Sequence, residues 1–170
     1  DSNIVKGQVL TNSNVVFKEF IRKHDFCAKY KPTRFVNASS ERSFMGFKRS
    51  DGRAGTRNFI AVVSTVNCSA TVVHEIASYF TQQKLKKYPN IDGVAAFSHS
   101  TGCGMELSGE PMNLLHRTLG GNINHPNVVS SLVVGLGCER CQVGGLFESQ
   151  GILESNKFKT LIMQENGGTT

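Results

Sequence analysis

A cysteine that recurs at a fixed interval constrains the fold of this chain more than any other feature. Cysteines stand at positions 68, 103 and 138, so a step of 35 residues separates each from the next. Each follows a short apolar run typical of a buried strand and precedes a segment that fits a helix. The runs span residues 59–66, 93–97 and 128–136, and a fourth run without a cysteine spans 158–163.

Strands that alternate with helices predict an α/β fold. We expect a Rossmann-like parallel sheet of at least four strands with helices on both faces, formed by residues 44–170. Residues 1–43 would be an N-terminal arm and linker. In such sheets ligands bind outside the carboxyl ends of the strands, so all three cysteines would face one edge where a ligand binds.

The composition limits the classes of partner. The formal charge is +6, but no long run of Lys and Arg accompanies it, so a nucleic-acid partner is not expected. No apolar run approaches the length of a membrane span. Five cysteines, three of them beside strand ends, indicate a reduced cytoplasmic protein rather than a secreted disulfide scaffold.

An arginine-rich segment lies just before the first strand. Arg49, Arg53 and Arg57 alternate with turn residues, and Asp51 and Asn58 lie among or next to them. Guanidinium groups bind carboxylates with two parallel hydrogen bonds, so these residues are candidates for binding an acidic substrate. A solvated loop with surface ion pairs is the equal alternative.

Several other residues near the predicted edge could carry chemistry. Cys68 would lie at a helix N-terminus, where the dipole favours a thiolate, although a buried inert cysteine is the alternative for each one. His99 could be a general base, a ligand or a structural residue. Glu110 could move a proton or simply complement the start of a helix, and Glu139 could bind metal, act as a base or begin a helix.

Three cysteines at one edge favour joint metal ligation. A structural zinc site uses four protein ligands, whereas a catalytic metal keeps one position open. Thiolates also suit iron, either as a single ion or as an iron-sulfur cluster with one iron free to bind a hydroxyl. Cys138 and Cys141 form a Cys-x-x-Cys pair, which could instead indicate a redox pair or half of a zinc site.

The ordered motifs resemble the altronate/galactarate dehydratase family of sugar-acid hydro-lyases. The resemblance covers about residues 44–170, and the segments that carry it are 46–58, 66–70, 99–105, 109–110, 117–119, 125–127 and 134–139. Cys141 departs from the family pattern, where a polar residue is expected, and His99-Ser100-Thr101 differs slightly from the usual His-Gly-Thr.

This resemblance implies dehydration of a sugar acid of the galactarate or altronate type to a 3-deoxy-2-keto acid. It also implies ferrous iron as cofactor, bound by Cys68, Cys103 and Cys138 with Glu139 as a further candidate. His99 or Glu110 would move the proton, and Arg49, Arg53 and Arg57 would hold the carboxylate. Such proteins are longer, so the chain resembles a middle domain whose partner is the rest of the enzyme, and inactivity of the isolated part is one expectation. Another copy of the chain is a further candidate partner.

Two other functions remain open from the sequence. A related lyase that expels sulfite from a sulfonated hydroxy acid such as sulfolactate could use the same framework. A non-catalytic nucleotide-binding module of the Rossmann type is the other alternative. Gly102-Cys103-Gly104 is only a fragment of the dinucleotide-binding fingerprint, which argues against that module.

Overall fold

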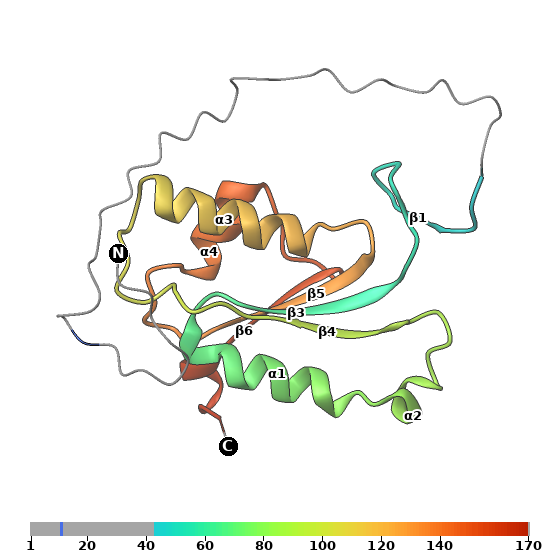
Figure 1. The fold of residues 1–170 in the computed structure, drawn as a ribbon, viewed down its shortest axis with the longest axis horizontal. Coiled ribbons are helices and arrows are strands. Elements are labelled where there is room, and N and C mark those ends of the chain that lie inside the picture. The colour runs from blue at the N-terminus through green and yellow to red at the C-terminus, as the bar shows by residue number, and fades with distance from the viewer. Residues whose placement is uncertain (1–10, 12–42, 170) are drawn as a thin grey trace. The chain divides into compact units, whose positions relative to one another are not determined.

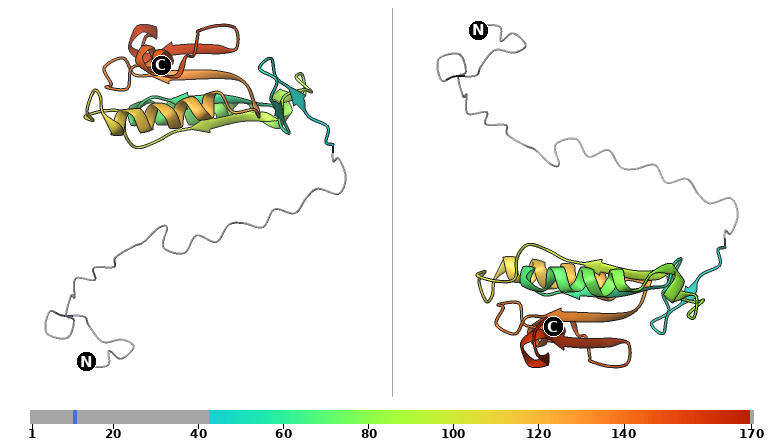
Figure 2. Two further views of the ribbon diagram at one scale, coloured as in Figure 1. Left: turned by 90° about the horizontal axis from the view of Figure 1, so that it is seen from above. Right: turned by 90° about the horizontal axis from the view of Figure 1, so that it is seen from below.

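The four apolar runs form one parallel sheet. The computed structural model describes residues 43–169 and, before them, Thr11 alone. Its main strands are β3 (Phe59–Ser64), β4 (Gly93–Phe97), β5 (Val128–Gly135) and β6 (Phe158–Ile162). They lie in the order β4-β3-β5-β6, and every neighbouring pair is parallel. Figure 2 shows β6 in red at one edge of the sheet.

Helices cover both faces of this sheet. Helix α1 (Ala70–Tyr79) lies on one face and is followed by the short α2 (Gln82–Leu85), whereas α3 (Glu110–Ile123) and α4 (Val143–Gln150) lie on the other (Figure 1). This arrangement confirms the predicted α/β class with a four-stranded parallel sheet. The predicted arm and linker, residues 1–43, fall almost entirely outside the described residues.

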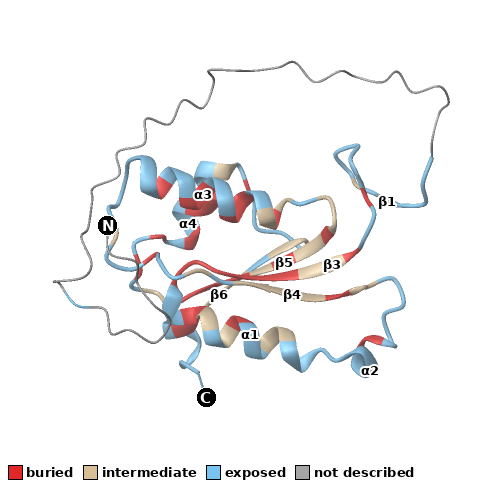
Figure 3. Cartoon of the chain, in the orientation of Figure 1, coloured by how far each residue is buried: buried red, intermediate tan, exposed pale blue. Residues whose placement is uncertain are grey.

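The two faces of β3 enter two different hydrophobic clusters. Val63 packs with residues of α3 and α4, including Leu119 and Leu146. Its neighbour Val62 packs on the opposite face with Val73 of α1. Successive strand residues point to opposite faces, so a strand that is apolar at both positions must be covered twice. Figure 3 shows the resulting concentration of buried residues in β3.

Local sequence signals explain where the helices begin. Pro111 occupies the first turn of α3, where its missing N–H is not needed. Helix α4 contains Gly144 and Gly145 and has weak intrinsic propensity, but it forms because Leu146 and Phe147 are buried against the sheet.

None of the helices in residues 43–169 is long and apolar enough to cross a membrane.

Smaller elements lie at both ends of the sheet. Strands β1 (Phe47–Lys48) and β2 (Ala54–Gly55) form a separate antiparallel hairpin just before β3. The 3-10 turns η1 (Asn67–Ser69) and η2 (Met163–Asn166) follow the carboxyl ends of β3 and β6. Figure 1 shows the hairpin at one end of the sheet and the start of α1 at the other.

Candidate active site

Three exposed cysteines lie on loops at the carboxyl ends of neighbouring strands. Cys68 is in η1 after β3, Cys103 is in the loop after β4, and Cys138 is in the loop after β5. All three are free and exposed. Because the strands are parallel, these loops lie at one edge of the sheet. We call residues 65–69, 98–109, 136–142 and 163–167 the cysteine edge.

The cysteine edge contains no preformed metal cluster. Within the described residues, no group of three His, Cys, Asp or Glu side chains lies close enough to hold a metal ion. The thiols therefore share an edge without converging on one point in this conformation. Their joint ligation of a metal stays a prediction.

Backbone hydrogen bonds join the three cysteine-bearing loops. The N–H of Asn67 donates to the carbonyl of Thr101 (2.9 Å), which connects the first loop with the second. The N–H groups of Arg140 and Cys141 donate to the carbonyl of Gly102 (2.9 and 3.3 Å), which connects the third loop with the second. Thr101 and Gly102 of the second loop therefore contact both of the other loops.

Gly102 fits this junction because it has no side chain. Its φ is +95°, in the left-handed region that favours glycine. A Cβ at this position would overlap the carbonyl oxygen of Thr65 and lie 2.9 Å from the Cα of Val66. The glycine therefore lets the second loop pack directly on the end of β3.

Glu139 joins the ends of β3 and β5 through a buried carboxylate. The Thr65 hydroxyl donates to its Oε1 (2.8 Å), as does the N–H of Leu136 (3.1 Å). The N–H of Gly137 donates to its Oε2 (2.6 Å). Only 3% of Glu139 is exposed. Both oxygens thus accept bonds that shape the loop carrying Cys138, and metal ligation by Glu139 stays a prediction.

Gln164 packs against the loop of Cys138 from the fourth strand. Its side-chain amide donates to the Cys138 Sγ (3.6 Å), and its backbone N–H donates to the carbonyl of Leu136 (3.0 Å). A Cβ at Gly137, where φ is +125°, would overlap the Gln164 side chain. No sequence motif pointed to Gln164, because the fourth apolar run has no cysteine at its end.

The two predicted proton-transfer residues have different surroundings. His99 is half-buried, and both ring nitrogens have backbone partners. Burial lowers its pKa, which outweighs the opposing effect of the bond to the Ser64 carbonyl. Glu110 is exposed at the start of α3 and accepts a hydrogen bond from Arg117 (3.0 Å). Glu110 thus has the more accessible functional group.

The predicted arginine cluster lies at the opposite edge of the sheet. Arg57 and Asn58 immediately precede β3, whereas the cysteines follow the strands. Strand β3 has six residues, so roughly 20 Å of strand separates its two ends. The structure therefore does not bring the predicted carboxylate clamp and the predicted metal ligands together within one chain.

Each residue of that cluster has partners within the chain. The Arg49 Nε donates to the Pro126 carbonyl (2.7 Å), and its Nη2 donates to the carbonyl of Arg57 (3.2 Å). Arg53 binds Asp51 through two side-chain bonds, and these bonds lower the pKa of Asp51 to about 2.

The last two residues of the cluster anchor the start of β3. The Arg57 Nε lies 3.6 Å from the Asp92 carboxylate, and the guanidinium stacks over Phe59. The Asn58 side-chain amide donates to the carbonyl of Asn90 (2.5 Å). These contacts hold the start of β3 against the segment just before β4, and substrate binding by the cluster stays a prediction.

Arg140 is a cation at the cysteine edge that the sequence analysis did not single out. It is the sole Arg or Lys within residues 65–69, 98–109, 136–142 and 163–167. The residue is exposed, and its guanidinium has no hydrogen-bond or ion-pair partner in the described structure. Its position two residues after Cys138 is the sequence signal that could have identified it.

Cys141, two residues beyond Glu139, differs from the other three described cysteines. It is fully buried in the cluster beneath α3 and α4. Burial raises its pKa to about 11, and the nearby Glu139 carboxylate adds to the shift. A thiol that stays protonated is a poor nucleophile and a poor metal ligand, so Cys141 is a core residue and Cys138-x-x-Cys141 is not an exposed redox pair.

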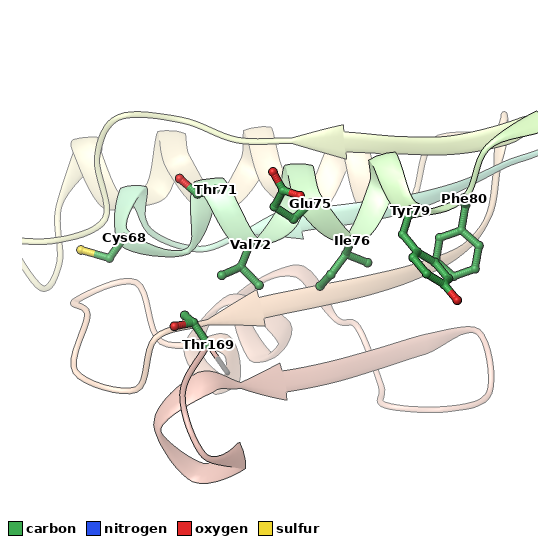
Figure 4. Close-up of a pocket in the computed structure, with 8 residues that line it drawn as sticks. All are labelled: Cys68, Thr71, Val72, Glu75, Ile76, Tyr79, Phe80 and Thr169. Atoms are coloured by element: carbon green, nitrogen blue, oxygen red, sulfur yellow. The ribbon is translucent and has the colours of Figure 1, made fainter.

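An apolar groove of about 660 Å³ runs along α1, on the flank of the helix that faces Thr169. Figure 4 shows Cys68 at one end, Tyr79 and Phe80 at the other, and Thr169 across from the helix. Val72 and Ile76 line the middle, and Glu75 is its charged lining residue. This lining does not suit the polar, anionic sugar acid that the sequence resemblance implies, so we assign the candidate site to the polar loops of the cysteine edge.

Comparisons with known proteins are informative for most of the chain. A family model described as D-galactarate dehydratase/altronate hydrolase, second domain, matches residues 46–170. Altronate dehydratase of Escherichia coli is 31% identical over 128 residues, which cover 75% of this chain and 25% of that enzyme. Altronate dehydratase of Bacillus subtilis is 30% identical over 144 residues, covering 85% of this chain and 28% of that enzyme.

A third relative is the beta subunit of a (2R)-sulfolactate sulfo-lyase from Chromohalobacter salexigens. It is 30% identical over 95 residues, which cover 56% of this chain and 21% of the subunit. The chain thus spans about a quarter of the length of the curated relatives it matches. No solved structure matches the chain.

Proposed function

Because the chain belongs to the D-galactarate dehydratase/altronate hydrolase family through its second domain, we propose that it forms part of a sugar-acid dehydratase. The reaction is the loss of water from an aldonate or aldarate of the altronate or galactarate type. The proton on the carbon beside the carboxylate and the hydroxyl on the next carbon are lost as water, and the resulting enol becomes a 3-deoxy-2-keto acid. The observation that carries the proposal is the family match over residues 46–170.

The cysteine edge is the proposed reaction site. Its loops come from the carboxyl ends of adjacent parallel strands, where ligands of such sheets bind. The loops are joined through Thr101 and Gly102, so the groups they carry hold fixed relative positions. Fixed positions matter because a catalytic group misplaced by about 1 Å loses much of its effect.

Cys68, Cys103 and Cys138 would hold ferrous iron, as a single ion or as a cluster. The donor chemistry fits, because the three thiols are free and exposed and thiolates are preferred ligands of iron. Since no three ligands converge in the described structure, we expect the cysteine side chains to rotate toward the ion when the metal binds, while the hydrogen-bonded loop backbone keeps its arrangement. The iron would supply a positive charge that stabilises the negative charge developing on the substrate.

Arg140 would hold the substrate carboxylate at this edge. Removal of a proton beside a carboxylate builds negative charge on its oxygens, and a nearby guanidinium stabilises that charge. Glu110 is the proposed proton acceptor, since its carboxylate is exposed at the start of α3. The remainder of the longer enzyme would complete the site, and more than one copy of the chain could assemble in it.

Loss of sulfite from a sulfonated hydroxy acid is the second candidate function. The similarity to a sulfolactate sulfo-lyase subunit favours it, although that match covers less of the chain than the altronate dehydratase matches do. The two reactions share proton removal beside a carboxylate and differ in the leaving group. The same arginine and carboxylate could therefore serve either one.

Anaerobic assays of the whole enzyme with ferrous iron test these functions. Altronate, galactarate and sulfolactate would be supplied separately, and 2-keto acid and sulfite would be measured. We expect 2-keto acid from a sugar acid, and sulfite from sulfolactate would instead favour the second candidate. Inactivity with all three acids, in an enzyme that binds iron, would contradict both.

Metal binding by the three cysteines can be tested in the 170-residue chain alone, without measuring activity. Cobalt(II) bound by thiolates absorbs strongly in the near ultraviolet, so cobalt titration reports ligation without requiring turnover. Replacing Cys68, Cys103 or Cys138 by Ala should weaken binding at least tenfold in each case. Cys141→Ala is the matched control and should bind cobalt as the unmodified chain does. Equal binding by all four variants would contradict the proposed ligand set.

A further inference from the structure

His99 has both ring nitrogens engaged by backbone groups. Its Nε2 lies 3.1 Å from the carbonyl oxygen of Ser64, and the N–H of Thr101 donates to its Nδ1 (3.3 Å). A carbonyl oxygen only accepts a hydrogen bond and a backbone N–H only donates one. Only a neutral ring with its proton on Nε2 satisfies both partners.

The environment of the ring favours this same state. The ring is half-buried at the end of β4, and burial lowers its pKa from the ordinary value. A second proton on Nδ1 would face the N–H of Thr101 and break that bond. In this geometry the imidazole has no free lone pair with which to accept a proton from a substrate or to bind a metal.

The bonded ring fixes the segment that joins the cysteine-bearing loops. His99 connects the end of β3 at Ser64 with Thr101, whose carbonyl accepts from Asn67 of the Cys68 loop. The next carbonyl, of Gly102, accepts from Arg140 of the Cys138 loop. The imidazole therefore begins a series of hydrogen bonds that continues through Thr101 and Gly102 to the loops of Cys68 and Cys138.

We infer that His99 is a positioning residue, which holds Thr101 and Gly102 in place and thereby sets the mutual arrangement of the three cysteine-bearing loops. It transfers no proton in the reaction. The inference rests on the proposed function in one respect, namely that these loops form the reaction site. The claim about the loops themselves depends on the hydrogen bonds alone.

Three substitutions separate the two bonds of the ring. In His99→Asn, the side-chain oxygen can accept from the N–H of residue 101, as in an Asx turn, but the link to Ser64 is lost. In His99→Gln, the longer amide can donate to the Ser64 carbonyl, but the bond to Thr101 is lost. His99→Phe keeps a ring of similar size and loses both bonds.

Amide hydrogen exchange of the 170-residue chain tests the positioning role directly. The N–H groups of Asn67 and Arg140 donate to the carbonyls of Thr101 and Gly102, so they report on the junction. We expect at least tenfold faster exchange at both in His99→Phe and smaller increases in His99→Asn and His99→Gln. The N–H of Gln164, which bonds to Leu136 elsewhere on the edge, is the internal control and should be unchanged.

The protonation state provides an independent readout. Nitrogen NMR of the unmodified chain should show the Nε2–H tautomer of His99 at pH 7. An Nδ1–H tautomer, or unchanged exchange at Asn67 and Arg140 in His99→Phe, would overturn the inference.

Turnover by the whole enzyme separates a positioning role from proton transfer. We expect His99→Asn or His99→Gln to retain turnover within about tenfold and His99→Phe to lose at least a hundredfold. Equal losses of a thousandfold in all three variants would identify His99 as the proton-transfer group and overturn the inference. If the unmodified enzyme turns over none of the acids, the proposed function fails, whereas the exchange and NMR measurements still decide the role of His99.

Discussion

Thr65 at the end of β3 and Glu139 after β5 are joined by a buried hydrogen bond of 2.8 Å across 74 positions of sequence. The same carboxylate accepts the backbone N–H groups of Leu136 and Gly137. One buried group therefore determines both the distance between two cysteine-bearing loops and the shape of one of them.

Glu139→Gln should destabilise the domain by about 1–3 kcal/mol, because an amide nitrogen in place of one carboxylate oxygen cannot accept a hydrogen bond and leaves a buried N–H without a partner. Urea denaturation followed by circular dichroism measures the free energy of unfolding. Glu148→Gln, at an exposed position of α4, is the matched control and should change the free energy of unfolding by less than about 0.5 kcal/mol. Equal stability of the two variants would contradict the role assigned to Glu139.

Gly102→Ala should lower the free energy of unfolding more than Gly104→Ala does, although both glycines have positive φ. The Cβ at 102 would overlap the backbone of Thr65 and Val66, whereas nothing lies within 4 Å of a Cβ at 104. We expect about 1 kcal/mol of destabilisation at 104 from the backbone conformation alone and more than about 3 kcal/mol at 102. Thermal and urea unfolding of the two variants provide the comparison, and a larger loss at 104 would refute the packing explanation.

Native-state alkylation should separate the described cysteines into two classes. Cys68, Cys103 and Cys138 are exposed and should react with iodoacetamide at pH 8. Cys141 is buried with a pKa of about 11, so we expect its alkylation to be at least a hundredfold slower until the chain unfolds. Mass spectrometry of tryptic peptides resolves the sites, with urea-unfolded protein as the reference for full reactivity.

The same thiol predicts a loss of stability in alkali. The pKa of Cys141 is raised from 9.0 to about 11 in the folded state, so the folded chain holds its proton after the unfolded chain has lost it. This contribution is present in full below pH 9 and is lost as the pH rises from 9 to 11, by about 2–3 kcal/mol. Cys141→Ala should abolish this part of the pH dependence, measured as the difference between the two denaturation profiles. Parallel profiles would show that Cys141 does not contribute.

Arg140→Gln in the whole enzyme should raise the KM for the sugar acid about ten- to a hundredfold, because a charge-assisted hydrogen bond to the carboxylate is lost. Arg140→Lys should recover part of this loss, since it keeps the charge but not the two-pronged geometry. Arg53→Gln at the opposite edge of the sheet is the control, and its KM should stay within about twofold of the unmodified enzyme. A larger increase in KM for Arg53→Gln than for Arg140→Gln would indicate that the arginine cluster before β3 binds the carboxylate.

The sequence alone determined the architecture of the domain. Apolar runs of strand length, separated by helix-compatible segments, require a parallel sheet covered on both faces, because only that arrangement buries runs that are apolar on both sides. The spacing of Cys68, Cys103 and Cys138 then placed them after three strands, and parallel strands end at one edge. Family membership was also visible in the order of the motifs around them.

Only the tertiary structure decided which side chains face one another. Arg49, Arg53 and Arg57 resembled a substrate clamp because three guanidinium groups cluster just before the first strand, but that strand runs straight from one edge of the sheet to the other and separates them from the cysteines. Glu139 and His99 looked free to react in the sequence, but the end of β3 supplies a hydrogen-bond partner to each, Thr65 and Ser64 respectively. Hydrogen bonds between residues far apart in sequence depend on strand register and loop packing, which no local pattern encodes.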